Sequence, residues 1–428
     1  MSASTLTALF SPASLAVIAA CTLYGTFIGA MPGLTATMAV ALLVPFTYFM
    51  DPLIAISAIV ATTTTAIFAG DVPGTLMRIP GTPASAAYVE DAYRLSRAGR
   101  SRSTLMVSLF AACIGGLVGV ALLALIAPQL ARVAVQFSSF ETFWLACLGL
   151  SCAVLTSNGS VAKSFSSLFL GLFIATIGID VAVGHPRFTF GNYELFDGIS
   201  FIPAIIGLFA LSEILRSAQI GHRDQPANAA QESFSKALHE AALVLRRFKR
   251  NIARSSVLGT LIGALPGAGA DIAAWICYAI SRRFSRHPER YGTGYIEGVT
   301  DGGSANNAAI GGAWTPALVF GIPGDSVTAI AIGILLLNGM SPGPQIFTES
   351  PELVHTLYGA FALSNLAMIP AGLLVIMASS QVVRIPRRVL MPCVLLFSLV
   401  GAYAITNSVI AIWTVLALGV LGYAMEAN

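Results

Sequence analysis

The chain has 428 residues, of which 56% are hydrophobic and only 10% are charged, and its mean hydropathy is +0.80. Soluble domains usually carry about 25% charged residues, so a soluble enzyme, a nucleic-acid-binding protein and a disordered scaffold are excluded. No Asp, Glu, Lys or Arg precedes Asp51, and further uncharged runs cover 103–131, 142–162, 198–212, 326–348, 353–383 and 389–425. Because a helix needs about 20 apolar residues to cross a membrane, the sequence predicts an all-α, multi-pass membrane protein.

The apolar runs, taken in chain order, predict about ten to twelve transmembrane or re-entrant elements. Several runs contain Pro-Gly pairs, which predict interrupted helices. The last run is long enough for two passes and has a break near Asn407. The runs lie near 12–30, 34–50, 52–69, 104–128, 138–157, 164–183, 198–215, 255–280, 305–338, 354–380 and 389–424.

Most of the 23 Lys and Arg residues fall in four short stretches. Short loops rich in Lys and Arg stay on the cytoplasmic side of a membrane, so we expect all four stretches inside the cell. They are Arg94, Arg97, Arg100 and Arg102; Arg246, Arg247, Lys249, Arg250 and Arg254; Arg282, Arg283, Arg286 and Arg290; and Arg384, Arg387 and Arg388.

The longest polar stretch, 217–254, ends in an apolar stripe at helical spacing opposite a basic face, typical of a helix at the membrane surface. The stripe consists of Phe234, Leu238, Ala241, Leu245 and Phe248. We expect this stretch to connect a first membrane repeat, 1–216, to a second, 255–428.

The two halves share two sequence blocks. Residues 25–33 recur at 259–267 with seven of nine positions identical, and the Ile-Pro-Gly of 79–81 recurs at 322–324. The basic stretches flank different blocks in the two halves, so equivalent loops are expected on opposite sides of the membrane. This pattern is typical of the inverted-topology repeats of secondary transporters.

Each shared block contains a Pro-Gly pair, which breaks a helix. Unpaired backbone groups are tolerated at membrane depth only where protein or a water-filled cavity covers them. We therefore expect the four breaks to converge on one internal site, where helix N-termini attract an anion and free carbonyl groups a cation. The alternative is that each pair only permits tight packing or a kink.

These blocks carry a family resemblance. In the first half it rests on 29–33, on 79–87 and on Asp91 and Tyr93. In the second half it rests on 265–270, 285–294, 297–299, 305–308, 321–324 and 341–344. Over nearly its whole length the chain resembles the large membrane subunit of tripartite tricarboxylate transporters.

The resemblance implies a cation-coupled importer of carboxylates in the bacterial inner membrane. It also implies two partners, a small membrane subunit and a soluble periplasmic receptor. We expect no cofactor and no nucleic-acid partner. Arg78 departs from the family pattern, which usually has an uncharged residue there, and Asp71, Asp271 and Asp325 stand where small neutral or hydroxyl residues are usual. The family normally continues with more apolar sequence beyond the last residue of this chain.

Charged residues at membrane depth usually face a partner or an aqueous cavity. We expect the Arg78 guanidinium to bind a substrate carboxylate bidentately; a buried pair with Asp71 or an aspartate of the other half is the alternative. Asp71, Asp271 and Asp325 are expected to hold the coupling cation, Na⁺ or a proton. Charge compensation for Arg78 would explain only one of them.

The substrate-binding candidates are the residues of the breaks and two adjacent amides, which either bind carboxylate or satisfy broken backbone. They are Gly33, Thr35, Arg78, Gly81, Thr82, Ser85, Gly267, Gly269, Asn306, Asn307, Gly324 and Ser326.

The sequence thus predicts a secondary active transporter subunit that imports a tricarboxylate, a dicarboxylate or a similar carboxylate with Na⁺ or H⁺. A passive anion channel is one alternative, and it would not need buried carboxylates. An intramembrane enzyme is a weaker alternative, because it would need an activated Ser, a His or a metal set at membrane depth, and the sequence shows none. We therefore expect no catalytic residue.

Overall fold

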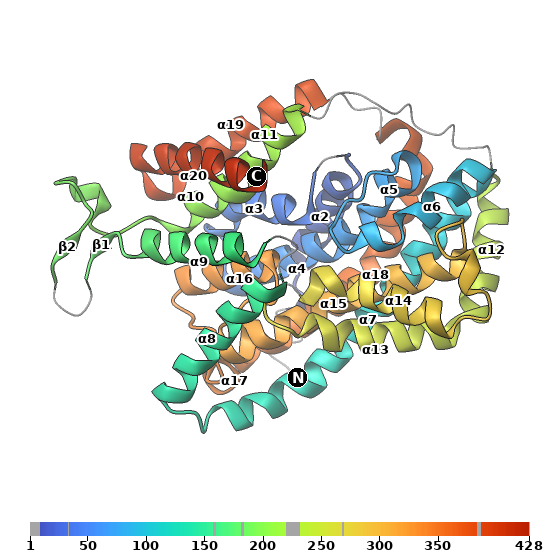
Figure 1. The fold of residues 1–428 in the computed structure, drawn as a ribbon, viewed down its shortest axis with the longest axis horizontal. Coiled ribbons are helices and arrows are strands. Elements are labelled where there is room, and N and C mark those ends of the chain that lie inside the picture. The colour runs from blue at the N-terminus through green and yellow to red at the C-terminus, as the bar shows by residue number, and fades with distance from the viewer. Residues whose placement is uncertain are drawn as a thin grey trace.

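A computed structural model describes residues 9–32, 34–156, 160–180, 184–219, 232–267, 269–382 and 387–427. Within these ranges the fold is all-α, as predicted, apart from one short antiparallel ribbon (Figure 1). The first helices are α2 (Pro12–Gly29), α3 (Ala36–Thr47), α4 (Pro52–Ala69), α5 (Asp71–Met77), α6 (Val89–Leu95), α7 (Ser101–Ala134), α8 (Ser139–Thr156), α9 (Val161–Ala175), α10 (Phe201–Ile205) and α11 (Ser212–Gln219).

The remaining helices are α12 (Phe234–Arg247), α13 (Lys249–Gly263), α14 (Gly269–Phe284), α15 (Ile296–Phe320), α16 (Ser326–Leu337), α17 (Ile346–Glu349), α18 (Pro351–Val382), α19 (Arg387–Thr406) and α20 (Val409–Ala427). The ribbon pairs β1 (Gly178–Ile179) with β2 (Pro186–Arg187). Short turns are η1 (Ser85–Ala87), η3 (Tyr193–Leu195) and η5 (Pro288–Arg290), and π-helical segments are η2 (Ser96–Arg100) and η4 (Ile206–Leu211).

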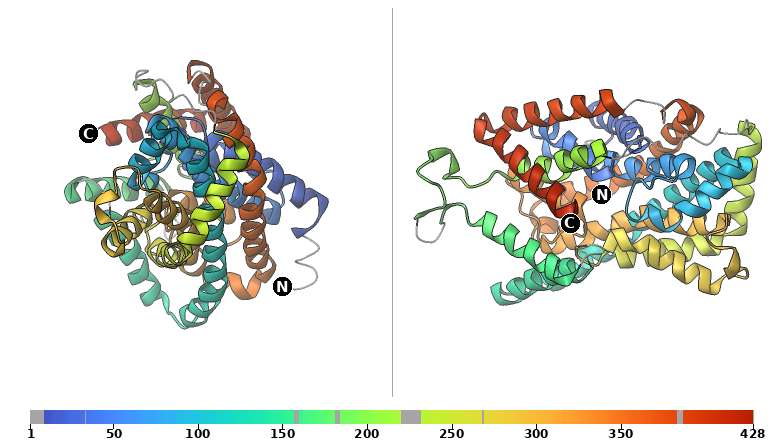
Figure 2. Two further views of the ribbon diagram at one scale, coloured as in Figure 1. Left: turned by 90° about the vertical axis from the view of Figure 1, so that its right-hand side faces the viewer. Right: turned by 45° about the horizontal axis from the view of Figure 1, so that its top comes forward.

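Four helical stretches are long and apolar enough to cross a membrane, judged by length and composition: Pro12–Gly29, Pro52–Met77, Val89–Ala134 and Pro351–Ser379. Several shorter helices, among them α3, α9 and α16, are also apolar. The apolar run 305–338 is interrupted at its Pro-Gly pair, as predicted, and forms the two helices α15 and α16. Gly321 ends α15 in a left-handed conformation with φ 66°. Figure 2 shows α9 and the ribbon extending away from the main body.

The core is built around α15, which is buried from Glu297 to Val319 and packs along α7, α13 and α14. Glycine makes this close approach possible, since small residues let membrane helices bring their backbones together. A Cβ at Gly119 of α7 would meet the backbone of Ala308, and one at Gly259 of α13 would meet the backbone of Ala305.

The helix that contains the start of the first block packs the same way in both halves. A Cβ at Gly29 would meet the backbone of Ala66 on α4, and a Cβ at Gly263 would meet the backbone of Ala309 on α15. Ala66 and Ala309 lie 243 positions apart, the same offset as the second shared block. The contact between α2 and α4 therefore recurs as the contact between α13 and α15. The opposite orientation of the two copies in the membrane stays a prediction.

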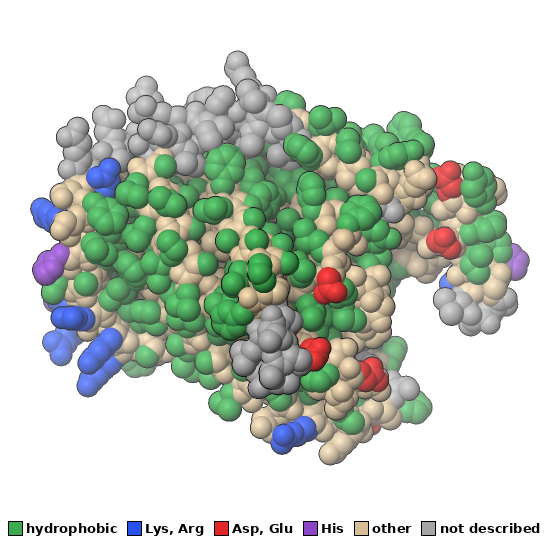
Figure 3. Space-filling view, turned by 180° about the vertical axis from the view of Figure 1, so that it is seen from behind, with side chains coloured by type: hydrophobic (Ala, Val, Ile, Leu, Met, Phe, Trp, Pro, Cys, Tyr) green, Lys and Arg blue, Asp and Glu red, His purple; other side chains and the backbone are tan. Residues whose placement is uncertain are grey.

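Basic side chains gather at the end of the fold where α6 and α12 lie (Figures 1 and 3). There Arg100 forms an ion pair with Glu240 of α12, and Arg254 donates a hydrogen bond to Ser281 of α14. Most of the visible Lys and Arg side chains in Figure 3 lie at this end. The fourth basic stretch falls outside the side chains that the structure describes. A shared end agrees with the expectation that the stretches lie on one side of the membrane.

The connector between the expected repeats forms α12, which packs on α7. It buries Ala237 and Ala241 there, whereas Phe234 and Leu238 of the predicted apolar stripe stay more than one-third exposed. The next helix, α13, runs without interruption across the expected boundary after residue 254.

Candidate functional site

All four Pro-Gly breaks meet at one pocket. They fall between α2 and α3, between α5 and η1, between α13 and α14, and between α15 and α16. Residues beside each break line the pocket, whose cavity volume is about 40 Å³. The candidate residues in its lining are Thr35, Gly81, Thr82, Asp271, Asn306, Asp325 and Ser326. The breaks therefore converge as their sequence predicted.

Equivalent positions of the two halves share one capping geometry at the pocket. In the first half Thr82 and Ser85 cap each other, since the amide of each donates to the hydroxyl of the other at 3.1 and 3.0 Å. At an offset of 243, Asp325 and Thr328 do the same: Thr328 N donates to Asp325 Oδ1 at 2.7 Å, and Asp325 N donates to Thr328 Oγ1 at 2.9 Å. The same capping geometry thus carries a hydroxyl in one half and a carboxylate in the other.

Three helices begin at the pocket. Thr35 caps α3 by accepting a hydrogen bond from Met38 N at 3.2 Å, and Asp325 caps α16. Asp271 lies in the first turn of α14. Helix N-termini present free N–H groups and the positive end of the helix dipole, so three such ends make the pocket favourable for an anion.

The charged side chains of the pocket are both acidic. Asp325 is 9% exposed and Asp271 is partly buried. No Lys or Arg is among the described residues that line the pocket. Two carboxylates in a small volume repel an incoming anion unless protons or a metal cation neutralise them. The pocket therefore combines helix ends that favour an anion with side chains that favour a cation.

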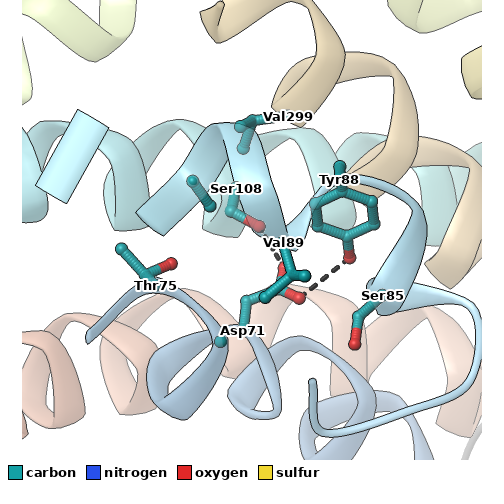
Figure 4. A pocket seen from close by; sticks show the side chains of 9 residues that line it. Asp71, Thr75, Ser85, Tyr88, Val89, Ser108 and Val299 are labelled. Carbon is teal, nitrogen blue, oxygen red and sulfur yellow. Dashed lines mark hydrogen bonds between the residues drawn. The ribbon is translucent and has the colours of Figure 1, made fainter. Parts of the chain in front are cut away.

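Asp71 lies in a smaller cavity beside the pocket, together with Ser85 and Tyr88 (Figure 4). Its Oδ1 accepts a hydrogen bond from the Tyr88 hydroxyl at 2.8 Å, and its Oδ2 accepts one from the Ser108 hydroxyl. Asp71 is 5% exposed. The expectation that Asp71 joins the other two aspartates in one site is not met, because α5 turns its side chain toward α6 and α7 instead.

The adjacent amides Asn306 and Asn307 point to different places. Asn306 Nδ2 donates to Tyr88 Oη at 3.3 Å and to Thr82 Oγ1 at 3.4 Å, and this side chain lines the pocket. Asn307 Nδ2 donates to the backbone oxygen of Thr64 on α4 at 3.2 Å. Asn306 is thus placed at the pocket, and Asn307 bridges two helices.

The glycines of the second half shape the breaks. Gly267 has φ 97° and donates its N–H to Pro323 O at 3.1 Å, which ties the two breaks of this half together. Cβ atoms at Gly269 and Gly324 would meet the backbone of Ile262 and of Ala313. Gly33 lies outside the described residues.

Arg78 lies outside the pocket, contrary to the expectation that it faces the substrate. It ends α5 with φ 60°, and this left-handed turn directs its side chain, 60% exposed, to Glu90, where Nε lies 2.7 Å from Oε2. The alternative pair with Asp71 or a second-half aspartate is wrong as well, because the partner is Glu90.

Replacing Arg78 by Gly should therefore leave transport unchanged. Glycine adopts φ 60° without the cost of a Cβ, which offsets an exposed ion pair worth about 0–1 kcal/mol, so we expect a free energy of unfolding within about 1 kcal/mol and a KM within about twofold of wild type. Uptake kinetics and thermal melting of the purified variant measure both. A KM raised about tenfold in this variant would show that the Arg78 guanidinium does contribute to substrate binding.

Tyr88, Ser108 and Thr37 lie at the site but were not predicted from the sequence. Tyr88 and Ser108 come from an unremarkable segment and from the middle of an apolar helix, and they meet Asp71 only through folding. Thr37 lines the pocket and lies 3.0 Å from Ser326 through their hydroxyl oxygens. Its place follows from the repeat, since Thr37 is equivalent to Asp271 at the 234-residue offset of the first block.

An all-α membrane protein whose interrupted helices surround one polar pocket has the architecture of transporters that bind small solutes within the membrane. The chain belongs to the tripartite tricarboxylate transporter TctA family, whose model matches residues 15–428. It is therefore a subunit of a transporter that works with partner subunits.

Two relatives from Agrobacterium vitis are similar to the chain. One is described as an uncharacterized 52.8 kDa protein in the TAR-I ttuC' 3' region; it is 32% identical over 401 residues, which are 94% of this chain and 79% of the relative. The other is described as an uncharacterized protein in the TAR-II ttuC' 3' region; it is 34% identical over 132 residues, 31% of this chain and 54% of the relative. No solved structure matches the chain.

Proposed function

We propose that this subunit imports a small organic anion together with a cation, and that the pocket between the four breaks holds both. The observation that carries the proposal is the meeting of three helix N-termini with two aspartates in one pocket. The helix ends bind the anion through N–H groups. Asp271 and Asp325 must first be neutralised, by Na⁺ or by protons, before a carboxylate can enter.

This electrostatic requirement supports coupling. A bound cation turns two repulsive carboxylates into part of a neutral or positive site, so each ligand raises the affinity of the other. The anion is a tricarboxylate, a dicarboxylate or a similar carboxylate, and Asn306, Thr82 and Ser326 offer it further hydrogen bonds. A passive channel has no need to keep two carboxylates where its anion passes.

The proposed assembly follows the family. The chain spans a bacterial inner membrane several times, pairs with a small membrane subunit and receives its anion from a periplasmic receptor. The contacts that recur at an offset of 243 support two repeats, and their opposite orientation would let one bundle move against the other around the pocket.

The proposal is tested by uptake of labelled citrate into proteoliposomes that contain the chain and its small membrane subunit, with a loaded receptor outside. Succinate and acetate serve as a dicarboxylate and a monocarboxylate for comparison. We expect accumulation of at least one of these anions above equilibrium when a Na⁺ or proton gradient is imposed, and none when both gradients are collapsed. Uptake that only equilibrates, with or without a gradient, would favour the channel.

A further inference from the structure

A continuous row of hydrogen bonds joins the buried carboxylate of Asp71 to the pocket. The row runs from Asp71 to the Tyr88 hydroxyl at 2.8 Å and from there to Asn306 Nδ2 at 3.3 Å. Asn306 Nδ2 also lies 3.4 Å from Thr82 Oγ1, and both Asn306 and Thr82 line the pocket. Asp71 itself lines only the smaller cavity (Figure 4).

The directions of these bonds depend on the charge of Asp71. A phenol has one proton, so when the Tyr88 hydroxyl donates to an ionised Asp71, its oxygen accepts from the Asn306 amide. A protonated Asp71 donates to the Tyr88 oxygen instead. The Tyr88 proton then needs an acceptor, and the Asn306 carbonyl provides one if the amide turns over. The two amide hydrogens then no longer bind Tyr88 and Thr82, and Asn306, which lines the pocket, can donate them to an anion.

We propose that Tyr88 is a positioning residue that transmits the charge of Asp71 to the pocket by setting the orientation of the Asn306 amide. Uptake of one proton by Asp71 then favours anion binding, and a bound anion favours the protonated Asp71, because coupling between sites is reciprocal. This inference rests on the proposed function and gives Asp71, which lies outside the pocket, a specific part in it.

The other charged groups around Asp71 are engaged elsewhere. On α6, Glu90 forms ion pairs with two arginines at the exposed face, and Asp91 accepts hydrogen bonds from a tyrosine and three backbone amides. On α15, Asp301 accepts hydrogen bonds from Ser255 and Asn251 of α13 and forms an ion pair with Arg254 of the same helix α13. Helix α4 contains no charged residue, and α7 contributes Ser108. Among these carboxylates, Asp71 is the one whose hydrogen-bond partner, Tyr88, is itself hydrogen-bonded to a residue of the pocket lining, Asn306.

Tyr88→Phe tests the row with little risk to the fold, since it removes only the hydroxyl. The ring is 2% exposed and packs on Gly302, where a Cβ would meet it, and both features persist with Phe. Tyr278→Phe is the matched control. Tyr278 also donates its hydroxyl to a buried aspartate, Asp91, at 2.7 Å, but that row does not reach the pocket.

The measurement is citrate affinity of the assembled transporter as a function of pH. When the protonated form of a group binds the anion better, affinity falls about tenfold per unit rise in pH between the pKa of that group in the free protein and its higher pKa in the complex. The slope of log affinity against pH gives the number of protons taken up per anion bound. We expect Tyr88→Phe and Asp71→Asn each to lower this number by about one. The double variant should lower it no further than either single variant. Tyr278→Phe should keep the wild-type slope. A wild-type slope in Tyr88→Phe, with the slope lost in Asp71→Asn, would overturn the inference.

A ligand-free measurement separates this inference from the proposed function. The infrared band of the protonated Asp71 carboxyl, identified by its absence in Asp71→Asn, gives the titration of Asp71 directly. Asn306→Leu should shift its midpoint in the wild-type background and leave it unshifted in the Tyr88→Phe background. Equal shifts in both backgrounds, or none in either, would contradict the relay. Failure of the wild type to bind any carboxylate would instead contradict the proposed function.

Discussion

Asp271→Asn and Asp325→Asn are each expected to uncouple anion uptake from the cation gradient. Each change removes one of the two negative charges from the pocket and so weakens the need for a neutralising cation. We expect gradient-driven accumulation of the labelled anion to fall about tenfold or more in each variant, a loss of about 1.4 kcal/mol or more of coupling. Counterflow without a gradient should persist, because the helix N-termini stay in place.

The chain offers a matched control for Asp325→Asn. Asp325 caps α16, and asparagine is an equally good cap, so the helix should be retained. Asp51 caps α4 through a hydrogen bond from Leu53 N at 3.0 Å and is exposed. Asp51→Asn makes the same chemical change away from the pocket and should leave coupling intact. Full coupling in both pocket variants would rule out these aspartates as the cation site.

Gly81→Val is expected to disrupt both the fold and transport. A Cβ at Gly81 would meet the Cα and backbone of Gly70, which have no flexible side chain to move aside. Forced overpacking of this kind costs about 1–3 kcal/mol or more, and here it also displaces Thr82 and Pro83 from the pocket wall. We expect a lower melting temperature of the detergent-solubilised protein and at least a tenfold lower uptake rate per folded molecule.

Gly171→Val is the matched control for this prediction. Gly171 lies in α9, and a Cβ there would meet nothing within 4 Å. Gly324→Val supplies a second test at the equivalent position of the other half, where a Cβ would meet the backbone of Ala313. Wild-type melting and uptake in both Gly81→Val and Gly324→Val would show that the close contacts at the breaks are dispensable.

The sequence predicted the breaks well because the chemistry that makes them is local. Proline lacks an N–H group and glycine tolerates positive φ, so a Pro-Gly pair favours a helix break. The pair Pro73-Gly74 near the start of α5 shows that position matters, because it lies inside the helix. The duplication of these pairs also predicted their convergence. Unpaired backbone N–H and C=O groups at membrane depth must be buried in protein or line a water-filled cavity, and one internal site can serve all four breaks. Residues next to the breaks, such as Thr82 and Asp325, therefore reached the pocket as expected.

The partners of the charged residues could not be predicted in the same way. A buried pair between Arg78 and Asp71 was one alternative to a substrate role for Arg78, but Arg78 ends α5 in a left-handed turn and its side chain is 60% exposed. Asp71 instead meets Tyr88 and Ser108, and Arg78 meets Glu90. These contacts depend on how α5, α6 and α7 are packed, which no local pattern encodes.

The sequence by itself thus determined the membrane class, the family blocks, the repeat and the four breaks, because charge scarcity, Pro-Gly chemistry and internal similarity are properties of the chain. Only the tertiary structure decided which charges share a pocket. It placed Asp271 and Asp325 there, moved Arg78 out of it, and connected Asp71 to it through Tyr88 and Asn306. The physical reason is that these contacts join residues far apart in the chain, such as Tyr88 and Asn306, which are 218 positions apart, and their distances are set by helix packing.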